Sequence, residues 1–241
     1  MSFSDLFKKN VSHPSCAAVI VAAGSSVRMG SDKLLAELGG VPVLARTLQA
    51  FERSEYVSEI VVVTRMDKVP TIADLCAEYK ISKVSKVVAG GKTRMESSLI
   101  GVSAVKGSAK LIAIHDAARP LVSGALIKRT VCAAAEHMAA VPVVPSTDTL
   151  KAVGEDNRVI GTVDRETTFR VQTPQVFDAV LIKGALTKAA EKGLTLSDDS
   201  AAMDMTGFKT YTVAGEEDNI KITTPRDLMI AEAILKDRGE L

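Results

Sequence analysis

Residues 18–33 read A-V-I-V-A-A-G-S-S-V-R-M-G-S-D-K, and this stretch indicates how the rest of the chain is organised. Its first residues are apolar, include the β-branched Val19, Ile20 and Val21, and stop at Gly24, which is typical of a buried strand in a parallel sheet. The residues that follow are mostly small, and Arg28 and Lys33 add two positive charges against one acid, Asp32. Backbone amides and cations at the end of a strand favour a polyphosphate site.

The spacing within this loop excludes two common phosphate-binding motifs. A dinucleotide fingerprint requires glycines at the first, third and sixth places, which here hold Gly24, Ser26 and Met29. A P-loop requires a second glycine followed directly by Lys and then Ser or Thr, but Gly30 is followed by S-D. The pattern A-A-G-x-x-x-R-M-G-x-x-K instead resembles the signature loop of nucleotidyltransferases that join a sugar or polyol phosphate to a nucleotide. An ordinary turn with two surface cations is the alternative.

Composition limits the partners of the chain. Its 241 residues carry a formal net charge of +1, which gives no general attraction to nucleic acid or to a membrane. The first fifteen residues lack the apolar core of a signal peptide, and the longest apolar run, residues 16–23, is too short to span a bilayer. Three widely spaced cysteines, Cys16, Cys76 and Cys132, predict buried free thiols in a reducing compartment. We therefore expect a soluble, cytoplasmic protein.

Strand and helix patterns alternate after the loop. Apolar β-branched runs predict strands at residues 60–64, 84–89, 111–114 and 209–214. Apolar residues at helical spacing predict helices near residues 44–51, 72–79, 95–102, 126–138 and 181–186. Ser123 is a possible N-cap for the fourth of these, and Thr224, Pro225 and Asp227 predict a last helix with a cap, a first-turn proline and the acid of a capping box. This alternation predicts an α/β fold with a doubly wound, mostly parallel, Rossmann-like sheet. Ligands bind beyond the carboxyl ends of such strands, so the loops at Gly24, Gly90 and His115 are expected to meet.

Residues 145–175 break this rhythm. The segment runs through S-T-D-T-L-K-A-V, a G-E-D-N turn and R-V-I-G-T-V-D-R before any new helix. This hairpin-like sequence predicts a β-arm that protrudes from the sheet and packs on a partner subunit, with a long surface insertion as the alternative. Because we find no internal repeat and no clear linker, we expect residues 1–241 to form a single domain with 145–175 as a dimerisation and substrate arm.

Two stretches at predicted strand ends have the composition of a binding site. G-G-K-T-R-M-E-S-S, residues 90–98, combines glycines that permit close backbone approach with Ser97, whose hydroxyl can bond a pyrimidine edge. H-D-A-A-R-P, residues 115–120, places Asp116 just past a strand, where a carboxylate suits Mg²⁺ and shared phosphates. No second histidine is near His115 in sequence, so we interpret it as structural.

Three further stretches carry charged residues. E-D-N-I-K-I-T-T-P, residues 217–225, offers Asp218 as a second metal ligand and Lys221 as a cation for a transferring phosphoryl group. In the predicted arm, the planar guanidinium of Arg165 suits a phosphate monoester. S-D-D-S-A-A-M-D, from Ser197, is interpreted as the capped start of a helix. Taken singly, each stretch is also compatible with a solvated surface.

Together these motifs resemble the 2-C-methyl-D-erythritol 4-phosphate cytidylyltransferases of the non-mevalonate isoprenoid pathway. The resemblance runs nearly end to end, through A-A-G-S-S-V-R-M-G, G-G-K-T-R-M-E-S, H-D-A-A-R-P, D-T-L-K, T-V-D-R, Q-T-P-Q-V-F, S-D-D-S-A and D-N-I-K-I-T. It implies a nucleotidyltransferase fold and transfer of CMP from CTP to methylerythritol phosphate, with Mg²⁺ or another divalent cation and a homodimer formed through the arm. One departure is that Leu34 follows the loop lysine, where many members have glutamine.

The resemblance also implies a role for each matching residue. The nucleotide would be held by Ala22, Ala23, Gly24, Gly91, Ser97 and Asp116, and the reacting phosphates by the catalytic cations Arg28, Lys33 and Lys221. Magnesium would bind Asp116 and Asp218. Methylerythritol phosphate would bind Arg119 and Thr173, together with Thr149 and Arg165 of the neighbouring subunit's arm.

Three other classes of protein share features of this sequence. Cytidylyltransferases that act on ribitol 5-phosphate or another polyol phosphate share nearly all these motifs, so they are the nearest alternative. A non-catalytic nucleotide-binding protein with the same fold is a more remote one. A short-chain NAD-dependent oxidoreductase is disfavoured because the third-place glycine of its fingerprint is missing, although Tyr79 does have a lysine, Lys83, four residues later.

Overall fold

The computed structural model describes residues 14–24 and 32–241. Its main sheet has the strand order β10-β7-β11-β6-β1-β4-β5, with β12 also paired to β7. The sheet comprises β1 (Cys16–Val21), β4 (Val57–Thr64), β5 (Val84–Ala89), β6 (Leu111–Asp116), β7 (Ala139–Pro145), β10 (Phe169–Val171), β11 (Gln175–Asp178) and β12 (Tyr211–Ala214). Pairs β1–β4, β1–β6, β4–β5 and β7–β12 are parallel, which confirms the predicted mostly parallel α/β sheet.

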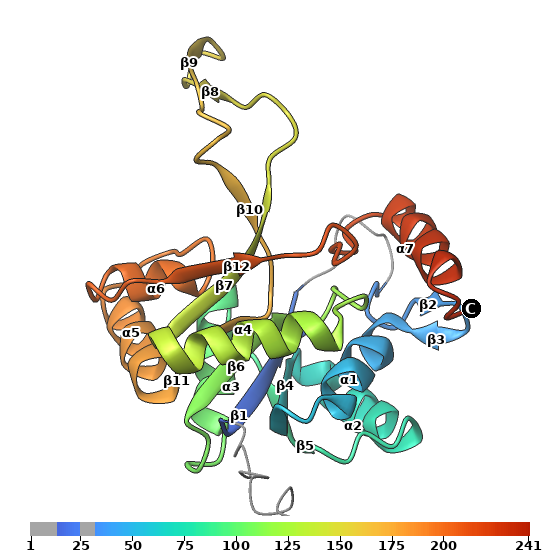
Figure 1. Ribbon diagram of the computed structural model, residues 1–241. Coiled ribbons are helices and arrows are strands. Elements are labelled where there is room, and N and C mark those ends of the chain that lie inside the picture. Colours follow the sequence, from blue (N-terminus) through green and yellow to red (C-terminus); the bar gives the residue numbers. More distant parts are fainter. Residues whose placement is uncertain (1–13, 25–31) are drawn as a thin grey trace, which may run out of the picture.

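Helices cover both faces of the sheet. One face packs against α1 (Val43–Arg53), α2 (Val69–Glu78), α4 (Gly124–His137) and α7 (Pro225–Asp237), and the other against α3 (Arg94–Ala104), α5 (Ala179–Glu191) and α6 (Ser200–Asp204). Alternate residues of β1 serve the two cores, since Ala18 and Ile20 belong to the first and Val19 to the second. Figure 1 shows the helices arranged around the sheet. The doubly wound arrangement is therefore confirmed.

Strand β11 runs antiparallel to both of its neighbours, β6 and β7. It was not predicted, because it has only four residues and directly follows the segment interpreted as an arm. The chain reaches it from β10 through a cis peptide bond between Thr173 and Pro174. This return path brings Thr173 next to the end of β6.

The segment between β7 and β10 contains β8 (Lys151–Val153) and β9 (Val159–Thr162), which pair with each other in an antiparallel hairpin. All four residues of β9 are exposed, and Figure 1 shows the hairpin standing away from the sheet. We call residues 146–168 the β8–β9 hairpin. Short elements elsewhere are β2 (Glu37–Leu38), β3 (Val41–Pro42) and the single turn η3 (Met66–Lys68).

Other local predictions can be checked against the same structure. The start of α7 has the expected capping box, in which the Thr224 side chain accepts from the Asp227 amide and the Asp227 side chain accepts from the Thr224 amide. Cys16 and Cys76 are buried free thiols, but Cys132 is exposed, so that part of the prediction was wrong. None of the helices formed by residues 14–24 and 32–241 has the length and apolar character to cross a membrane.

Candidate active site

A cavity of about 330 Å³ opens where the parallel strands β1, β5 and β6 end. The predicted residues that line it are Ala22, Ala23, Gly24, Lys33, Gly91, Ser97, Asp116 and Lys221. The remaining lining residues are Val21, Leu34, Lys92, Thr93, Arg94 and Ala118. The expectation that the loops at Gly24, Gly90 and His115 meet at one crevice is confirmed, because Gly24, Gly91 and Asp116 from these three loops all line the cavity. The cavity is within the size range of small-molecule sites.

The start of α3 forms one side of the cavity. Its N-cap Thr93 accepts from the Glu96 amide at 3.1 Å, and the Glu96 carboxylate accepts from the Lys92 amide at 2.6 Å. Ser97 Oγ accepts from the Gly91 amide at 3.2 Å and donates to the Thr93 carbonyl at 2.9 Å. The Ser97 hydroxyl therefore fixes the loop before α3 and retains one acceptor position for another donor.

Space beside this loop is tight. A Cβ atom on Gly90 would lie 2.8 Å from the Ala23 Cβ and 2.7 Å from Ser97 Oγ. Any side chain at Gly90 would therefore push the loop after β1 away from the loop after β5. Glycine here lets the two loops approach closely enough to share one cavity.

Asp116 lies at the end of β6 between two cations. Lys221 Nζ is 2.7 Å from Asp116 Oδ2, and Arg94 Nη2 is 3.2 Å from Asp116 Oδ1. Burial alone would raise the pKa of the Asp116 carboxyl, but the charges of Arg94, Lys221 and Arg119 outweigh it and hold that pKa well below its usual value. Asp116 is therefore ionised at neutral pH.

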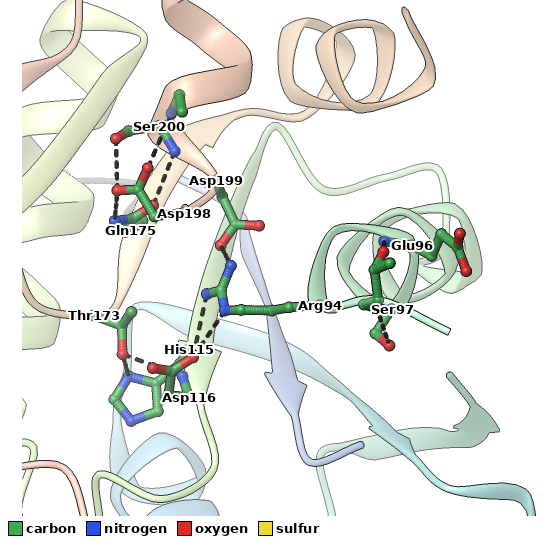
Figure 2. A network of polar contacts seen from close by, with 12 residues as sticks. Arg94, Glu96, Ser97, His115, Asp116, Thr173, Gln175, Asp198, Asp199 and Ser200 are labelled. Atoms are coloured by element: carbon green, nitrogen blue, oxygen red, sulfur yellow. Dashed lines mark hydrogen bonds and ion pairs between the residues drawn. The ribbon is translucent and has the colours of Figure 1, made fainter. Parts of the chain in front are cut away.

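Arg94 was not among the predicted site residues. Its guanidinium bridges Asp116 and Asp199, with Nη1 2.7 Å from Asp199 Oδ2, and Figure 2 shows it between the two carboxylates. The Asp199 side chain is 1% exposed. The sequence offered only a weak signal, an arginine in the first turn of a predicted helix and an acid before another.

His115 supports the same site from behind. Its Nε2 lies 3.2 Å from the Arg119 carbonyl, which can only accept, so Nε2 carries the proton and Nδ1 accepts from Thr173 Oγ1 at 3.1 Å. Thr173 Oγ1 in turn accepts from the Asp116 amide at 3.1 Å. Burial lowers the pKa of His115 to about 3, so the ring is neutral at pH 7. This agrees with the interpretation of His115 as structural.

Carbonyl groups of the loop before α7 hold the remaining cations of the site, Lys33 and Arg119. Lys33 Nζ donates to the Ile222 carbonyl at 3.1 Å, directly after Lys221. The Ile222 amide donates to the Ala118 carbonyl at 2.8 Å, which ties this loop to the end of β6. Arg119 Nη1 donates to the Asn219 carbonyl at 2.6 Å.

The other predicted residues lie outside the cavity lining. Arg119 and Thr173 both contact the Asp116 backbone, since the Arg119 amide donates to the Asp116 carbonyl and Thr173 Oγ1 accepts from the Asp116 amide. Thr149 and Arg165 are exposed positions of the β8–β9 hairpin. Asp218 Oδ2 lies 3.0 Å from Arg238 Nη2, so a metal shared with Asp116 would compete with that ion pair, and this pairing stays a prediction. Arg28 lies outside the described residues.

The carboxylate that lines the cavity is that of Asp116, and the described residues contain no cluster of three or more His, Cys, Asp or Glu side chains suited to a metal. A magnesium ion can be held by one or two carboxylates if phosphate oxygens and water complete its shell. The donor set therefore fits a magnesium ion that arrives with a polyphosphate. A protein cage around the ion is not part of the described structure.

Taken together, the described charges favour an anionic ligand. The site holds four cations, Lys33, Arg94, Arg119 and Lys221, against two acids, Asp116 and Asp199, so positive charge is in excess. Fixed cations and amides in a partly buried cavity stabilise phosphate charge more strongly than they would in water.

Comparisons with known proteins agree with this site. The sequence profile of the IspD family, described as 2-C-methyl-D-erythritol 4-phosphate cytidylyltransferase, matches residues 16–237. Proteins of that name from Halalkalibacterium halodurans and Caldanaerobacter subterraneus are 42% and 41% identical, covering 92% and 91% of this chain and 97% and 98% of their own length. The crystal structure of 4-diphosphocytidyl-2C-methyl-D-erythritol synthase from Anaerococcus prevotii has a TM-score of 0.83 at 33% identity, covering 93% of this chain and 97% of that one. The chain belongs to the 2-C-methyl-D-erythritol 4-phosphate cytidylyltransferase (IspD) family and is a nucleotidyltransferase.

Proposed function

We propose that this protein transfers CMP from CTP to 2-C-methyl-D-erythritol 4-phosphate, releasing pyrophosphate. The observation that carries the proposal is the cavity lined by residues 22–24, Lys33, Gly91, Asp116 and Lys221. It combines backbone amides, a small-residue pocket beside α3 and fixed cations. These are the groups needed to hold a base and a triphosphate.

In this proposal the two ends of the cavity have different tasks. The cytosine occupies the side formed by Gly91 and Ser97, where the serine hydroxyl has a free acceptor position. Lys33 and Lys221 hold the phosphates, together with Arg28. The residues 22–24 offer backbone groups to the nucleotide between these two ends.

The reaction needs charge neutralisation more than proton transfer. The attacking atom is a phosphate oxygen of the acceptor, which is already anionic at pH 7, so no general base is required. His115 is consistent with this, because both of its ring nitrogens are engaged by Arg119 and Thr173. Lys33 and Lys221 stabilise the charge that moves to the leaving pyrophosphate during in-line attack at the α-phosphorus.

We further propose a divalent cation, Mg²⁺ by preference, with Asp116 as its protein ligand. When bound, the ion would neutralise part of the triphosphate charge. Asp116 is suited to this task because it stays ionised and its carboxylate lines the cavity. Asp218 would join it only after leaving Arg238.

The acceptor site would be completed by a second copy of the chain. Exposed apolar side chains of the β8–β9 hairpin and of β10, among them Ile160 at 72% and Val159 at 61% exposure, support packing against a partner. Thr149 and Arg165 of the second copy would then bind methylerythritol phosphate together with Arg119. Free cysteines at Cys16, Cys76 and Cys132 support a cytoplasmic location.

Pyrophosphate release tests the proposal. Purified protein is incubated with CTP and Mg²⁺ and with either methylerythritol phosphate or ribitol 5-phosphate. Release with the first acceptor is expected to exceed release with the second. A preference for ribitol 5-phosphate would transfer the assignment to that related activity, and no metal-dependent use of CTP would contradict a catalytic function altogether.

A further inference from the structure

Arg94 and Asp199 form an ion pair at the wall of the cavity, with the Asp199 carboxylate almost fully buried. The same guanidinium contacts Asp116 Oδ1 at 3.2 Å, while Lys221 contacts Asp116 Oδ2. We propose that Asp199 is a positioning residue that holds Arg94 against Asp116 and thereby leaves Lys221 available to substrate phosphates. The inference rests on the proposed function and adds a residue to its site.

The carboxylate of Asp116 contacts two cations at once. Each of its two oxygens contacts a different cation, Arg94 on one side and Lys221 on the other. If Arg94 moved away, Lys221 would remain as the closest cation to a buried carboxylate and would be attracted more strongly. The lysine side chain is 40% exposed, so it is free to make that adjustment. Its ammonium would then be less available to a phosphate.

The guanidinium of Arg94 is held in place by a second carboxylate, that of Asp199. An arginine side chain has several rotatable bonds, and its planar, pre-organised fork loses less entropy per hydrogen bond when it contacts two partners than when it contacts one. Asp199 supplies the second point at 2.7 Å, opposite Asp116. Figure 2 shows the guanidinium spanning the space between these two carboxylates.

The segment that carries Asp199 is itself held by hydrogen bonds on both sides of this residue. Gln175 Nε2 donates to Asp198 Oδ2 at 2.8 Å, and the Ser200 amide donates to Gln175 Oε1 at 3.0 Å. Asp198 Oδ1 also accepts from the Ala201 amide at 3.1 Å. Asp198 and Ser200, the two neighbours of Asp199, are thus hydrogen-bonded to β11 or to the start of α6. These bonds keep the Asp199 carboxylate at a fixed position for its contact with Arg94.

Single and double variants test the proposal with CTP, Mg²⁺ and methylerythritol phosphate. Asp199→Asn keeps the size of the side chain and removes its charge. Its kcat is expected to fall about tenfold to a hundredfold, the range typical when a group that orients a binding residue is lost. The KM for CTP is expected to change less than about threefold, because Lys33, Gly91 and Ser97 still hold the nucleotide and the loss of Lys221 is felt mainly in the transition state, where charge moves to the leaving pyrophosphate.

A variant pair separates positioning from folding. Arg94→Met leaves Asp199 buried without a cation, so its Tm is expected to fall, and adding Asp199→Asn to it is expected to restore much of that Tm. The kcat of the double variant is expected to stay as low as that of Arg94→Met. Arg129→Met is the matched control, because Arg129 pairs with Glu216 at 3.3 Å outside the cavity lining, and its kcat is expected to match wild type.

Two results would overturn the inference. One is a folded Asp199→Asn variant with wild-type kcat, and the other is a double variant that regains kcat together with Tm. An inactive wild-type protein would instead contradict the proposed function, so the two failures are distinguishable.

Discussion

Lys221 Nζ lies 2.7 Å from Asp116 Oδ2, which joins the loop before α7 to the end of β6. The backbone reinforces this link, because the Ile222 amide donates to the Ala118 carbonyl at 2.8 Å. Two segments far apart in sequence therefore present a lysine and a carboxylate side by side. The contact explains how a surface-like turn of charged residues becomes one wall of a cavity.

Replacing this lysine is expected to affect catalysis more than folding. Lys221→Ala and Lys33→Ala should each lower kcat about a hundredfold to a thousandfold, the loss typical of removing one preorganised charge contact. Asp116 would still have Arg94 as a counter-ion, so the Tm of Lys221→Ala should change little. Pyrophosphate release measures kcat, and Lys236→Ala, which removes an exposed lysine paired with Glu232, is the control. Wild-type turnover in a folded Lys221→Ala protein would refute the assignment.

The neutral, buried His115 predicts how stability depends on pH. Burial lowers its pKa to about 3, whereas an unfolded histidine has a pKa of about 6.5. The unfolded chain therefore takes up the proton first as the pH falls. The stability associated with the neutral ring is complete above about pH 6.5 and decreases progressively toward pH 3, by at most about 1.4 kcal/mol per pH unit.

His115→Gln should flatten that part of the profile. A glutamine can still donate to the Arg119 carbonyl and accept from Thr173, but it does not titrate. Urea unfolding between pH 7 and pH 4 compares the slopes of the two proteins. His137→Gln, at a partly exposed position on α4, is the matched control for the exchange of a histidine for a glutamine. Equal slopes for His115→Gln and wild type would show that His115 does not titrate as described.

The parallel part of the fold could be predicted because its signals are local. β-Branched runs marked β1, β4, β5 and β6, and Ser123 and Thr224 marked helix starts as N-caps. Strand β11 could not be predicted in the same way. Its four residues form a strand only because β6 and β7 lie on either side to receive them.

Only the part of the candidate site that lies at strand ends could be predicted from the sequence. Loops that leave the carboxyl ends of parallel strands lie at the same edge of the sheet. The sequence could therefore predict that Gly24, Gly91 and Asp116 lie near one another. Arg94 and Asp199 both lie in stretches that the sequence marked as possible site or helix-start residues, but their ion pair depends on how α3 packs against the segment before α6, which no local pattern predicts. The prediction that Cys132 is buried was wrong for a simpler reason. Cys132 directly follows the buried Val131 but lies on the solvent side of α4.

Disrupting the β8–β9 hairpin is expected to separate the proposed dimer. Ile160→Asp puts a charge at a 72% exposed apolar position of β9, which would be buried against a second copy. Light scattering should then report a monomer, and kcat/KM for methylerythritol phosphate should fall at least about tenfold as Thr149 and Arg165 of the partner are withdrawn. Val180→Asp, at a 78% exposed position of α5, should leave both unchanged. A dimeric, active Ile160→Asp protein would contradict this role of the hairpin.

The packing of α3 on the sheet requires a glycine at Gly101. A Cβ atom there would lie 2.3 Å from Val19 Cγ1 and 2.6 Å from Val63 Cγ2, closer than van der Waals contact allows. Gly101→Ala should therefore destabilise the protein by about 1–3 kcal/mol, the usual cost of overpacking a core. Gly184→Ala in α5 is the matched control, because no atom lies within 4 Å of its added Cβ, and it should stabilise by about 0.5–1 kcal/mol. Urea unfolding measures both, and an unchanged midpoint for Gly101→Ala would mean that α3 can shift away from β1 and β4 at little cost.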